Sequence, residues 1–400
     1  MKCLSLSSQR SASNADVIFS MFCSRDKDYN VYFTERILEQ DDSLLPGLLG
    51  DRKTLIVTTP TVARFYGSLI DDLIKQHRLT AGVLVIACDE NNKSLERVSE
   101  ICNTALAFEL DRQGLLVAVG GGVCSDLVTM AASLIRRGIE HIRVPTTLIG
   151  QVDAAVGIKG AVNFGGKKSF LGAFYPPASV LIDPTLLKTL PIAHLRYGLA
   201  EVIKIAVICD SELFNLVANH SAELLASGFQ KPFDCSSRVL RLAALRMLEQ
   251  LQPNPYEDQG YKRLVDVGHT FSPALEAASG YALHHGEAVA IDLAISATIG
   301  AELGLMIDVE RDLIVETILA AGLPIFSELV TEEFCLKALR DVSLHRGGSI
   351  NLVIPVRIGE AIFLEHEYEL PFEALRSSLM RLAEESRELE KCKEAFQAHC

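Results

Sequence analysis

The sequence predicts two domains, an N-terminal α/β domain with a parallel sheet and a mostly α-helical C-terminal domain. Two observations indicate this fold class. Up to about residue 190, short apolar runs rich in β-branched residues alternate with amphipathic helical patterns, which is typical of βαβ units. Beyond that point helical periodicity predominates. A chain of 400 residues is also too long for one ordinary hydrophobic core and suits two.

The α/β domain is expected to begin where polar and apolar residues first alternate, at Tyr29–Thr34. The run Lys53–Thr59 is β-branched and is bounded by Pro60, which predicts a buried strand. Further apolar runs and helical patterns then follow in turn. The expected strands are residues 29–34, 53–59, 82–87, 115–120 and 140–144, and the expected helices are 61–77, 94–106 and 126–137.

The second domain is predicted from a series of segments with helical periodicity. They are residues 196–208, 211–228, 236–251, 269–279, 285–304, 308–322 and 331–341, with few strands between them. A last segment, 372–398, is amphipathic and charged, which favours a solvated or partner-binding face. The expected organisation is a poorly ordered extension at 1–28, the α/β domain at 29–190, the helical domain at 191–371 and a charged C-terminal helix at 372–400.

The composition limits which binding partners and which cellular compartment we expect for this protein. The formal net charge of −13 provides no general basic surface, so we expect neither nucleic acid nor a membrane as a partner. The Ser-rich beginning lacks the apolar stretch of a secretory signal, and no segment reaches the ~18 apolar residues of a membrane span. Ten cysteines without a Cys-x-x-Cys pair favour free thiols in a reducing compartment. We therefore expect a cytoplasmic protein.

A glycine triplet, Gly120–Gly122, stands between an expected strand and an expected helix. Exposed amides and the positive helix end at such a turn can receive the phosphates of a dinucleotide. Ser125 stands where the full dinucleotide pattern has its last glycine, so a plain tight turn remains the alternative. Glu90 and Lys93 follow the preceding strand, where they would bond a ribose or adenine edge or else form a charge pair at a helix start.

Polar residues suited to an anionic, polyhydroxylated substrate follow the glycine turn. They are Asp153, Lys159, Asn163 and Lys168. Lysine and asparagine donate hydrogen bonds to phosphate and hydroxyl oxygens. An acidic protein that binds an anion must concentrate its positive charge locally, and residues 159–168 do so.

The helical domain contains candidate metal ligands. Glu201 lies in a helical segment, with Lys204 three residues later on the same face. His269 and the pair His284–His285 each stand beside a glycine at an expected helix start. One glutamate with two histidines is a common ligand set of catalytic Zn²⁺ sites. A buried histidine with a structural role is the alternative for each, and the residues alone do not choose between His284 and His285.

Six motifs occur together in this chain and in a fixed order. They are Gly-Gly-Gly-Val-x-x-Asp-Leu, Pro-Thr-Thr-Leu, Gln-Val-Asp-x-x-Val-Gly-x-Lys, Ala-Glu-Val-Ile-Lys, Gly-His-Thr-Phe and His-Gly-Glu-Ala. In this combination the chain resembles the sugar phosphate cyclases, whose best-known member is 3-dehydroquinate synthase. The resemblance covers residues 53–365. It implies an NAD-binding α/β domain, a helical metal-binding domain and an active site between them.

The resemblance also implies roles for individual residues. Zn²⁺ (or Co²⁺) would be bound by Glu201, His269 and His285. NAD would be contacted by Glu90, Lys93, Gly121, Gly122, Val123, Asp126, Thr146, Thr147, Lys159, Lys168, Leu187 and Thr189. Substrate contacts and catalysis would involve Asp153, Lys159, Asn163, Lys168, Lys204, Asp266 and His345. Arg137 matches a position that reaches the phosphate of the neighbouring subunit, which implies a functional homodimer.

Departures from 3-dehydroquinate synthase indicate one branch of the family. That enzyme usually has Gly-Gly-Lys-Thr, Asn and His where this chain has Gly157–Gly160, Asp266 and Pro273. These residues resemble the branch that cyclises sedoheptulose 7-phosphate. Asp266 and His345 resemble the 2-epi-5-epi-valiolone synthases, because desmethyl-4-deoxygadusol synthases tend to have Ala and Thr there. Ser169 replaces a family Asn, and the sequence does not define the effect.

The resemblance implies a cycle of transient NAD-dependent oxidation, β-elimination of phosphate, re-reduction and intramolecular aldol closure to 2-epi-5-epi-valiolone. Asp266 would repel the carboxylate of the dehydroquinate synthase substrate. The alternatives are a desmethyl-4-deoxygadusol synthase with the same substrate, a 3-dehydroquinate synthase, a metal-dependent polyol dehydrogenase and a catalytically inactive scaffold.

Overall fold

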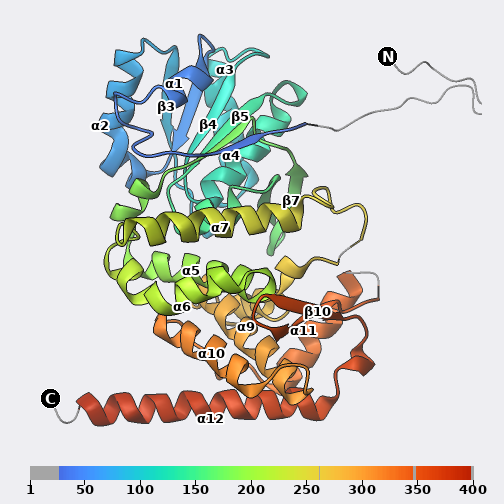
Figure 1. The fold of residues 1–400 in the computed structure, drawn as a ribbon. Helices are drawn as coiled ribbons and strands as arrows, with labels where there is room; N and C mark the ends of the chain where they lie inside the picture. Colours follow the sequence, from blue (N-terminus) through green and yellow to red (C-terminus); the bar gives the residue numbers. More distant parts are fainter. Residues whose placement is uncertain (1–26, 261, 346–347, 398–400) are drawn as a thin grey trace, which may run out of the picture.

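The computed structural model describes residues 27–260, 262–345 and 348–397. A six-stranded parallel sheet with helices on both faces is followed by a mostly helical domain (Figure 1). The predicted fold class is confirmed. The predicted extension lies outside the described residues except for its last two positions. The predicted domain boundaries near residues 190 and 371 stay predictions.

The sheet has the strand order β1-β8-β5-β4-β2-β3, and all neighbouring strands are parallel. The strands are β1 (Asn30–Phe33), β2 (Thr54–Thr58), β3 (Ala81–Val85), β4 (Leu115–Gly120), β5 (Glu140–Pro145) and β8 (Ser179–Ile182). The helices are α1 (Leu44–Leu49), α2 (Pro60–Gln76), α3 (Leu95–Ala107) and α4 (Gly122–Leu134). The helix expected at 126–137 thus begins earlier, so the glycine triplet lies directly at its start.

The central strands bury side chains on both faces of the sheet. On β2, Leu55 and Val57 belong to a core shared with α3 and α4, while Ile56 belongs to a core shared with α1 and α2. Because successive side chains of a strand point to opposite faces, one continuous apolar run serves both layers. This explains why each central strand appears in the sequence as an unbroken run rich in β-branched residues.

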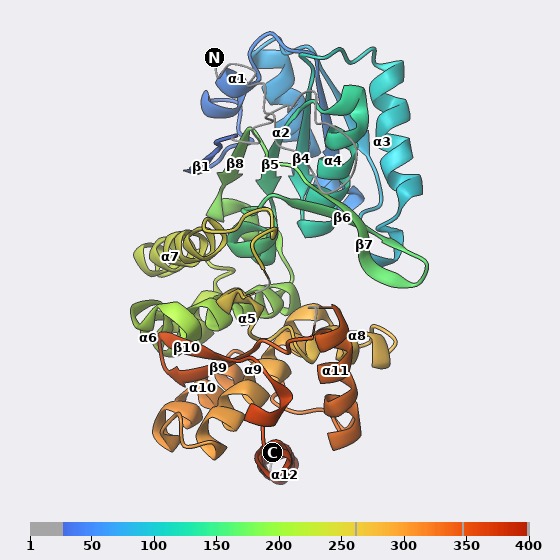
Figure 2. The ribbon, with the colours of Figure 1, turned by 90° about the vertical axis from the view of Figure 1, so that its right-hand side faces the viewer.

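The segment between β5 and β8 contains elements that the sequence did not predict. A π-helical turn, η3, spans Gly150–Ala154, and β6 (Lys159–Phe164) and β7 (Lys167–Phe174) form an antiparallel hairpin. Gly165 and Gly166 have φ of 58° and 76° at its tip, a conformation that glycine adopts without strain. Figure 2 shows the hairpin extending from the sheet toward the helical domain.

The helical domain surrounds one central helix. Its elements are α5 (Ile192–Cys209), α6 (Ser211–Ala226), α7 (Phe233–Leu251), α8 (Ser272–Ala278), α9 (His285–Glu302), α10 (Asp308–Ala320), α11 (Glu332–His345), α12 (Phe372–Gln397) and the antiparallel hairpin β9 (Leu352–Arg357) and β10 (Glu360–Leu364). Helix α9 is buried along nearly its whole length and packs against α5, α8, α10 and α12. The helix expected at 269–279 begins only at Ser272, so that prediction is corrected and His269 lies in the preceding turn.

Helix α12 is more than a solvated surface. Its residues Leu375, Leu379 and Leu382 lie in the same hydrophobic core as α9. Arg311 on α10 pairs with Glu385 of α12 at 2.6 Å. The helix is therefore anchored to the domain by apolar packing and by a partly buried ion pair. Within the described ranges, no helix is both long and apolar enough to cross a bilayer.

Candidate active site

Glu201, His269 and His285 lie together, with one potential ligand atom of each within 4.8 Å of the others. Glu201 is on α5, His285 is the first residue of α9, and His269 lies before α8. His285 Nε2 is 3.1 Å from Glu201 Oε1, although the two residues are 84 positions apart in the chain. The packing of α5 against α9 thus brings Glu201 and His285 together, and the turn before α8 adds His269. One carboxylate and two imidazoles fit a divalent zinc-type ion.

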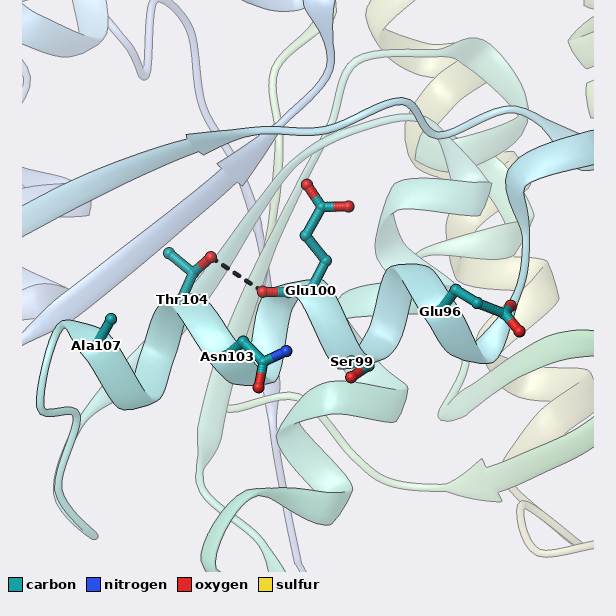
Figure 3. Close-up of a pocket in the computed structure, with 6 residues that line it drawn as sticks. All are labelled: Glu96, Ser99, Glu100, Asn103, Thr104 and Ala107. Carbon is teal, nitrogen blue, oxygen red and sulfur yellow. Dashed lines mark hydrogen bonds between the residues drawn. The ribbon is translucent and has the colours of Figure 1, made fainter.

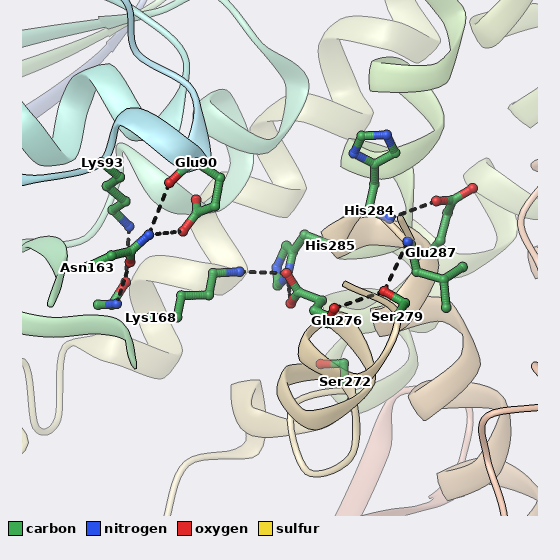
Figure 4. A network of polar contacts seen from close by, with 12 residues as sticks. Glu90, Lys93, Asn163, Lys168, Ser272, Glu276, Ser279, His284, His285 and Glu287 are labelled. Carbon is green, nitrogen blue, oxygen red and sulfur yellow. Dashed lines mark hydrogen bonds and ion pairs between the residues drawn. The ribbon is translucent and has the colours of Figure 1, made fainter. Parts of the chain in front are cut away.

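The two histidines are oriented by further hydrogen bonds through Nδ1. His269 Nδ1 lies 3.2 Å from the carbonyl oxygen of Val267, and His285 Nδ1 lies 2.9 Å from Glu276 Oε1. Such contacts fix the ring orientation of metal-binding histidines. Figure 4 shows Glu276 between His285 and Lys168, whose Nζ lies 2.7 Å from Glu276 Oε2. Lys168 of the β6–β7 hairpin is thereby linked to a candidate metal ligand.

Sequence reasoning did not single out Glu276. The available signal was an acidic residue within the otherwise apolar and small run Ala274–Ala278. It is 4% exposed, and an unpaired carboxylate at that depth would be costly. A buried acid in such a segment therefore indicates a cationic partner.

Burial and neighbouring charges shift the pKa values of the two imidazoles in opposite directions. Burial and the positive charge of Lys204 lower the pKa of His269 to about 3. Burial alone would lower the pKa of His285, but hydrogen bonds to Glu201 and Glu276 outweigh it and raise the pKa to about 9. His269 is therefore neutral at pH 7, and His285 is an imidazolium that donates one N–H to Glu276 and the other to Glu201.

Lys204 and Asp153 border the same cluster. Lys204 Nζ is 2.6 Å from Glu201 Oε2 on the shared face of α5, as the three-residue spacing predicted. Burial alone would lower the pKa of Lys204, but the carboxylates of Glu201 and Asp153 outweigh it and raise that pKa. Burial and the charge of Glu201 raise the pKa of Asp153, which reaches the cluster from η3 of the α/β domain. Residues from both domains thus meet here.

A chain of ion pairs lies next to the cluster, on the loop between α7 and α8. Arg263 Nη2 is 2.6 Å from Asp266 Oδ1, and Arg263 also pairs with Glu257. Glu257 pairs in turn with Lys159 at the start of β6. Lys159 and Asp266, both predicted substrate residues, are therefore connected through two residues that sequence reasoning missed.

Lys93 and Glu90 bond residues of other segments. Lys93 Nζ is 2.6 Å from Asp126 Oδ2 on α4 and 3.0 Å from Ser169 Oγ on β7. Glu90 Oε1 accepts a hydrogen bond from the Asn163 amide at 3.0 Å, visible in Figure 4. Ser169 has a φ of 50°, and its N–H donates to Asn163 Oδ1 at 2.8 Å. These contacts join segments that are far apart in the chain, so they differ from the local charge pair that was the alternative.

The glycine turn lies in close contact with the residues that follow β5. A Cβ on Gly121 would lie 3.0 Å from Thr147 Cγ2, and one on Gly122 would lie 3.0 Å from Ala154 Cβ. The Thr146 N–H donates to the Gly120 carbonyl oxygen at 2.9 Å. A side chain at either position would push against these neighbours, so glycine favours the close approach. Val123, in the first turn of α4, is half-buried beside them.

The remaining predicted site residues lie away from the Glu201 cluster or have a side chain that the structure does not describe. Leu187 is buried in the helical core, and Thr189 Oγ1 lies 2.9 Å from the Tyr66 hydroxyl. Arg137 is exposed on the turn after α4. His345 is the last residue of α11, and its side chain falls outside the described part of the structure. The contacts predicted for these residues stay predictions.

His284 is separated from the cluster by its orientation. It is exposed, and its ring stacks on Tyr197 with centroids 4.7 Å apart. Figure 4 shows the rings of His284 and His285 pointing in different directions. The structure thus favours the histidine that the family resemblance selected.

A shallow hollow on α3 contains none of these residues. It is lined by Glu96, Ser99, Glu100, Asn103, Thr104 and Ala107 (Figure 3). Its lining comes from one helix face and carries no basic side chain, so it offers no site for an anionic ligand.

Comparisons with known proteins identify the family of this chain. The models of the 3-dehydroquinate synthase N-terminal and C-terminal parts match residues 83–197 and 198–342. A 2-epi-5-epi-valiolone synthase from Streptomyces glaucescens is 40% identical over 92% of this chain and 95% of that protein. The chain belongs to the 3-dehydroquinate synthase family. Its two matched parts contain the two halves of the candidate site, the glycine turn in the first and the Glu201 cluster in the second.

Two further relatives of this family member are informative. A solved 2-epi-5-epi-valiolone synthase from Streptomyces hygroscopicus subsp. jinggangensis, with NAD⁺ and Zn²⁺ bound, is 37% identical with a TM-score of 0.86. The match covers 92% of this chain and 99% of that chain. A demethyl-4-deoxygadusol synthase from Trichormus variabilis is 33% identical over 84% of each chain.

Proposed function

We propose that this member of the 3-dehydroquinate synthase family is a 2-epi-5-epi-valiolone synthase that acts on sedoheptulose 7-phosphate. The observation that carries the proposal is the cluster of Glu201, His269 and His285 beside the buried Lys204, in a chain 40% identical to an enzyme of that name. NAD⁺ and Zn²⁺ (or Co²⁺) are the proposed cofactors, because the solved relative contains NAD⁺ and Zn²⁺.

The residues that the structure describes fit both the metal ion and NAD⁺. Glu201, His269 and His285 would bind the metal, and the amides of Gly121 and Gly122 would face the dinucleotide phosphates at the start of α4. When bound, NAD⁺ accepts and returns a hydride while the metal polarises substrate hydroxyls. Further proposed NAD contacts come from Glu90, Lys93, Val123, Asp126, Thr146, Thr147, Lys159, Lys168, Leu187 and Thr189.

The remaining site residues would bind the sugar and move its protons. Because burial and Glu201 raise the pKa of Asp153, this carboxylate accepts a proton more readily than an exposed aspartate. Lys204, held charged by its carboxylate neighbours, would donate hydrogen bonds to substrate oxygens. Lys159, Lys168 and Asn163 would supply donors to the phosphate that leaves during elimination.

The ion pairs around Asp266 favour a substrate without a carboxylate. Arg263 already pairs with both Asp266 and Glu257, so its charge is neutralised within the protein. A substrate carboxylate would meet Asp266 and Glu257 there instead of an unengaged cation. Hydroxyl groups, in contrast, can donate to these carboxylate oxygens. His345 is proposed as a further contact to the same part of the sugar.

We also propose that the enzyme is a cytoplasmic homodimer in which Arg137 reaches the phosphate site of the partner. The exposed position of Arg137 after α4 supports the dimer, because the side chain is accessible to a partner subunit. The absence of a Cys-x-x-Cys pattern from the sequence supports the reducing, cytoplasmic compartment. Light scattering would measure the oligomeric state. If the protein is an active monomer, the role of Arg137 is wrong.

Incubation of the purified protein with sedoheptulose 7-phosphate, followed by NMR of the product, tests the proposal. We expect 2-epi-5-epi-valiolone. The second candidate is a demethyl-4-deoxygadusol synthase, favoured by the 33% identical relative. Its deoxygenated product is distinguishable in the same spectrum. An unchanged substrate would contradict both assignments.

A further inference from the structure

Arg143 on β5 is fully buried, with 0% of its surface exposed. Its side chain lies behind the site, between α4 and the segment that joins η3 to β6. Burial lowers the pKa of Arg143 to about 10, against the raising effect of Asp126 and Tyr29, so the guanidinium remains charged at pH 7. Taking such a charge out of water is costly, and its retention calls for a physical reason.

All the N–H groups of this guanidinium are engaged by uncharged oxygens. Nη1 donates to the carbonyls of Ala155 and Gly157, at 3.0 and 2.6 Å. Nη2 donates to the Lys159 carbonyl at 3.0 Å and to Thr129 Oγ1 at 2.8 Å, and Nε also donates to Thr129 Oγ1. One planar group therefore binds three alternate carbonyls of a short segment.

The segment bound in this way connects two proposed substrate residues. Asp153 lies in η3 just before it, and Lys159 opens β6 at its end. The Tyr29 hydroxyl donates to the Val156 carbonyl at 2.5 Å, so the intervening residues are held from two sides. Residues 155–158 lie between η3 and β6 and belong to neither a helix nor a strand, so their carbonyls are not bonded within a regular helix or sheet.

We propose that Arg143 is a positioning residue that fixes the backbone of Ala155–Lys159 and thereby the directions of the Asp153 and Lys159 side chains. A single planar cation with five donors can satisfy several carbonyls at once, whereas lysine cannot match this fork geometry. The inference rests on the proposed function for the roles of Asp153 and Lys159. Its structural part, the fixed segment, is independent of the reaction.

A second buried arginine provides a matched control. Arg311 on α10 is 1% exposed, and its Nε also donates to a buried threonine hydroxyl, Thr298 Oγ1, at 3.0 Å. It pairs with Glu385 on α12 and has no part in the site. Both arginines are buried and bonded to a threonine, but only Arg143 binds the backbone of the site.

The test compares Arg143→Lys with Arg311→Lys. For Arg143→Lys we expect kcat/KM to fall about 100-fold, the effect of a small displacement of catalytic groups. Metal content should stay near wild type, because the proposed metal ligands lie on other segments. NAD⁺ affinity should change little, because Lys159 is one of many proposed NAD contacts and the others lie on other segments. Arg311→Lys should lower the midpoint of thermal unfolding but leave kcat/KM near wild type.

Thr129→Val is the second variant, in case Arg143→Lys does not fold. It removes the hydroxyl that accepts two guanidinium bonds and should lower kcat/KM in the same direction by a smaller factor. Binding of inorganic phosphate, measured by calorimetry, separates this inference from the proposed reaction. It should weaken about tenfold in Arg143→Lys even if the natural substrate is different.

Two results would overturn the inference. One is wild-type kcat/KM and phosphate affinity in a folded Arg143→Lys or Thr129→Val protein. The other is a loss of activity in Arg311→Lys as large as that in Arg143→Lys, since stability alone would then account for both.

Discussion

The proposed cofactor half of the candidate site lies at the carboxyl ends of central strands of the parallel sheet, whereas the proposed metal half is assembled by helix packing. In the first half, Gly121 and Thr147 follow the ends of the adjacent strands β4 and β5. In the second, His285 meets Glu201 across 84 positions of sequence. Sheet edges bring successive loops together by topology, but the metal cluster depends on the contact of α5 with α9.

The two halves therefore differ in how sensitive they are to single substitutions. The metal half consists of few groups, and Glu201 bonds both His285 and Lys204 directly, so loss of one leaves a buried polar partner unsatisfied. In the proposed cofactor half, the contacts would be spread over the amides of Gly121 and Gly122 and several side chains, so a single side-chain change would remove only one of them. We therefore expect larger effects from substitutions at the metal half.

The largest effect is expected from His269→Ala. Removing one of three proposed ligands should abolish stoichiometric metal binding and lower kcat at least about 1000-fold, because a metal supplies several kcal/mol of transition-state stabilisation. His284→Ala is the matched control, since that ring stacks on Tyr197 outside the cluster. Metal analysis and turnover measure both. Full activity in His269→Ala after chelation would refute the ligand assignment.

Glu276→Gln should have an intermediate effect. The amide cannot accept charge-assisted bonds from both Lys168 and His285, so metal affinity or activity should fall about 10- to 100-fold. Titration with Zn²⁺ after chelation measures the affinity. Glu302→Gln, at the far end of α9, is the control. Equal metal affinity in the two variants would show that Glu276 does not orient His285.

Lys93→Met addresses the cofactor half and should be milder. Without Lys93, the Asp126 carboxylate loses its ion pair, and NAD⁺ should bind about tenfold more weakly, with unchanged metal content. Fluorescence titration with NADH measures this directly. Lys167→Met, an exposed change on the β6–β7 hairpin that Lys93 contacts through Ser169, is the control. A collapse of metal binding in Lys93→Met would contradict the separation of the two halves.

The smallest effect on activity is expected from Asp292→Asn. The Asp292 carboxylate, on α9, accepts hydrogen bonds from the backbone N–H groups of Phe271 and Ser272. Burial raises the pKa of Asp292 from 3.8 to about 6, against these hydrogen bonds. The folded state then binds the proton more tightly than the unfolded state. Stability from this group is therefore greatest below about pH 4 and declines as pH rises through 6, by up to about 3 kcal/mol.

Thermal unfolding of chelated wild type and Asp292→Asn from pH 4.5 to 7 checks this sign. The wild type should gain stability relative to the variant as pH is lowered. Parallel pH profiles would show that Asp292 does not titrate in this range.

Much of this architecture was predictable from the sequence, for physical reasons that differ between elements. The strand Thr54–Thr58 is buried on both faces, so its β-branched run was a clear signal. The hairpin β6–β7 was missed because its exposed strand Lys167–Phe174 carries no buried apolar face to produce a pattern. The start of α8 was placed too early because His269 lies in a turn stabilised by tertiary contacts.

The site shows the same division. Glu201 and Lys204 were predictable as neighbours, since helix geometry alone places them on one face. Glu276 and Arg143 were not, because their importance arises from what the fold places beside them. Arg143 in particular sits in a strand pattern, and only the structure shows carbonyls of residues 155–159 around its guanidinium.

The ratio of phosphate released to NADH accumulated, measured with sedoheptulose 7-phosphate, tests the central claim most directly. A cyclase that returns its hydride should release many phosphates per enzyme molecule while the absorbance of NADH stays at its starting level. Accumulation of one NADH per substrate consumed, with no phosphate released, would instead identify a dehydrogenase and contradict the account.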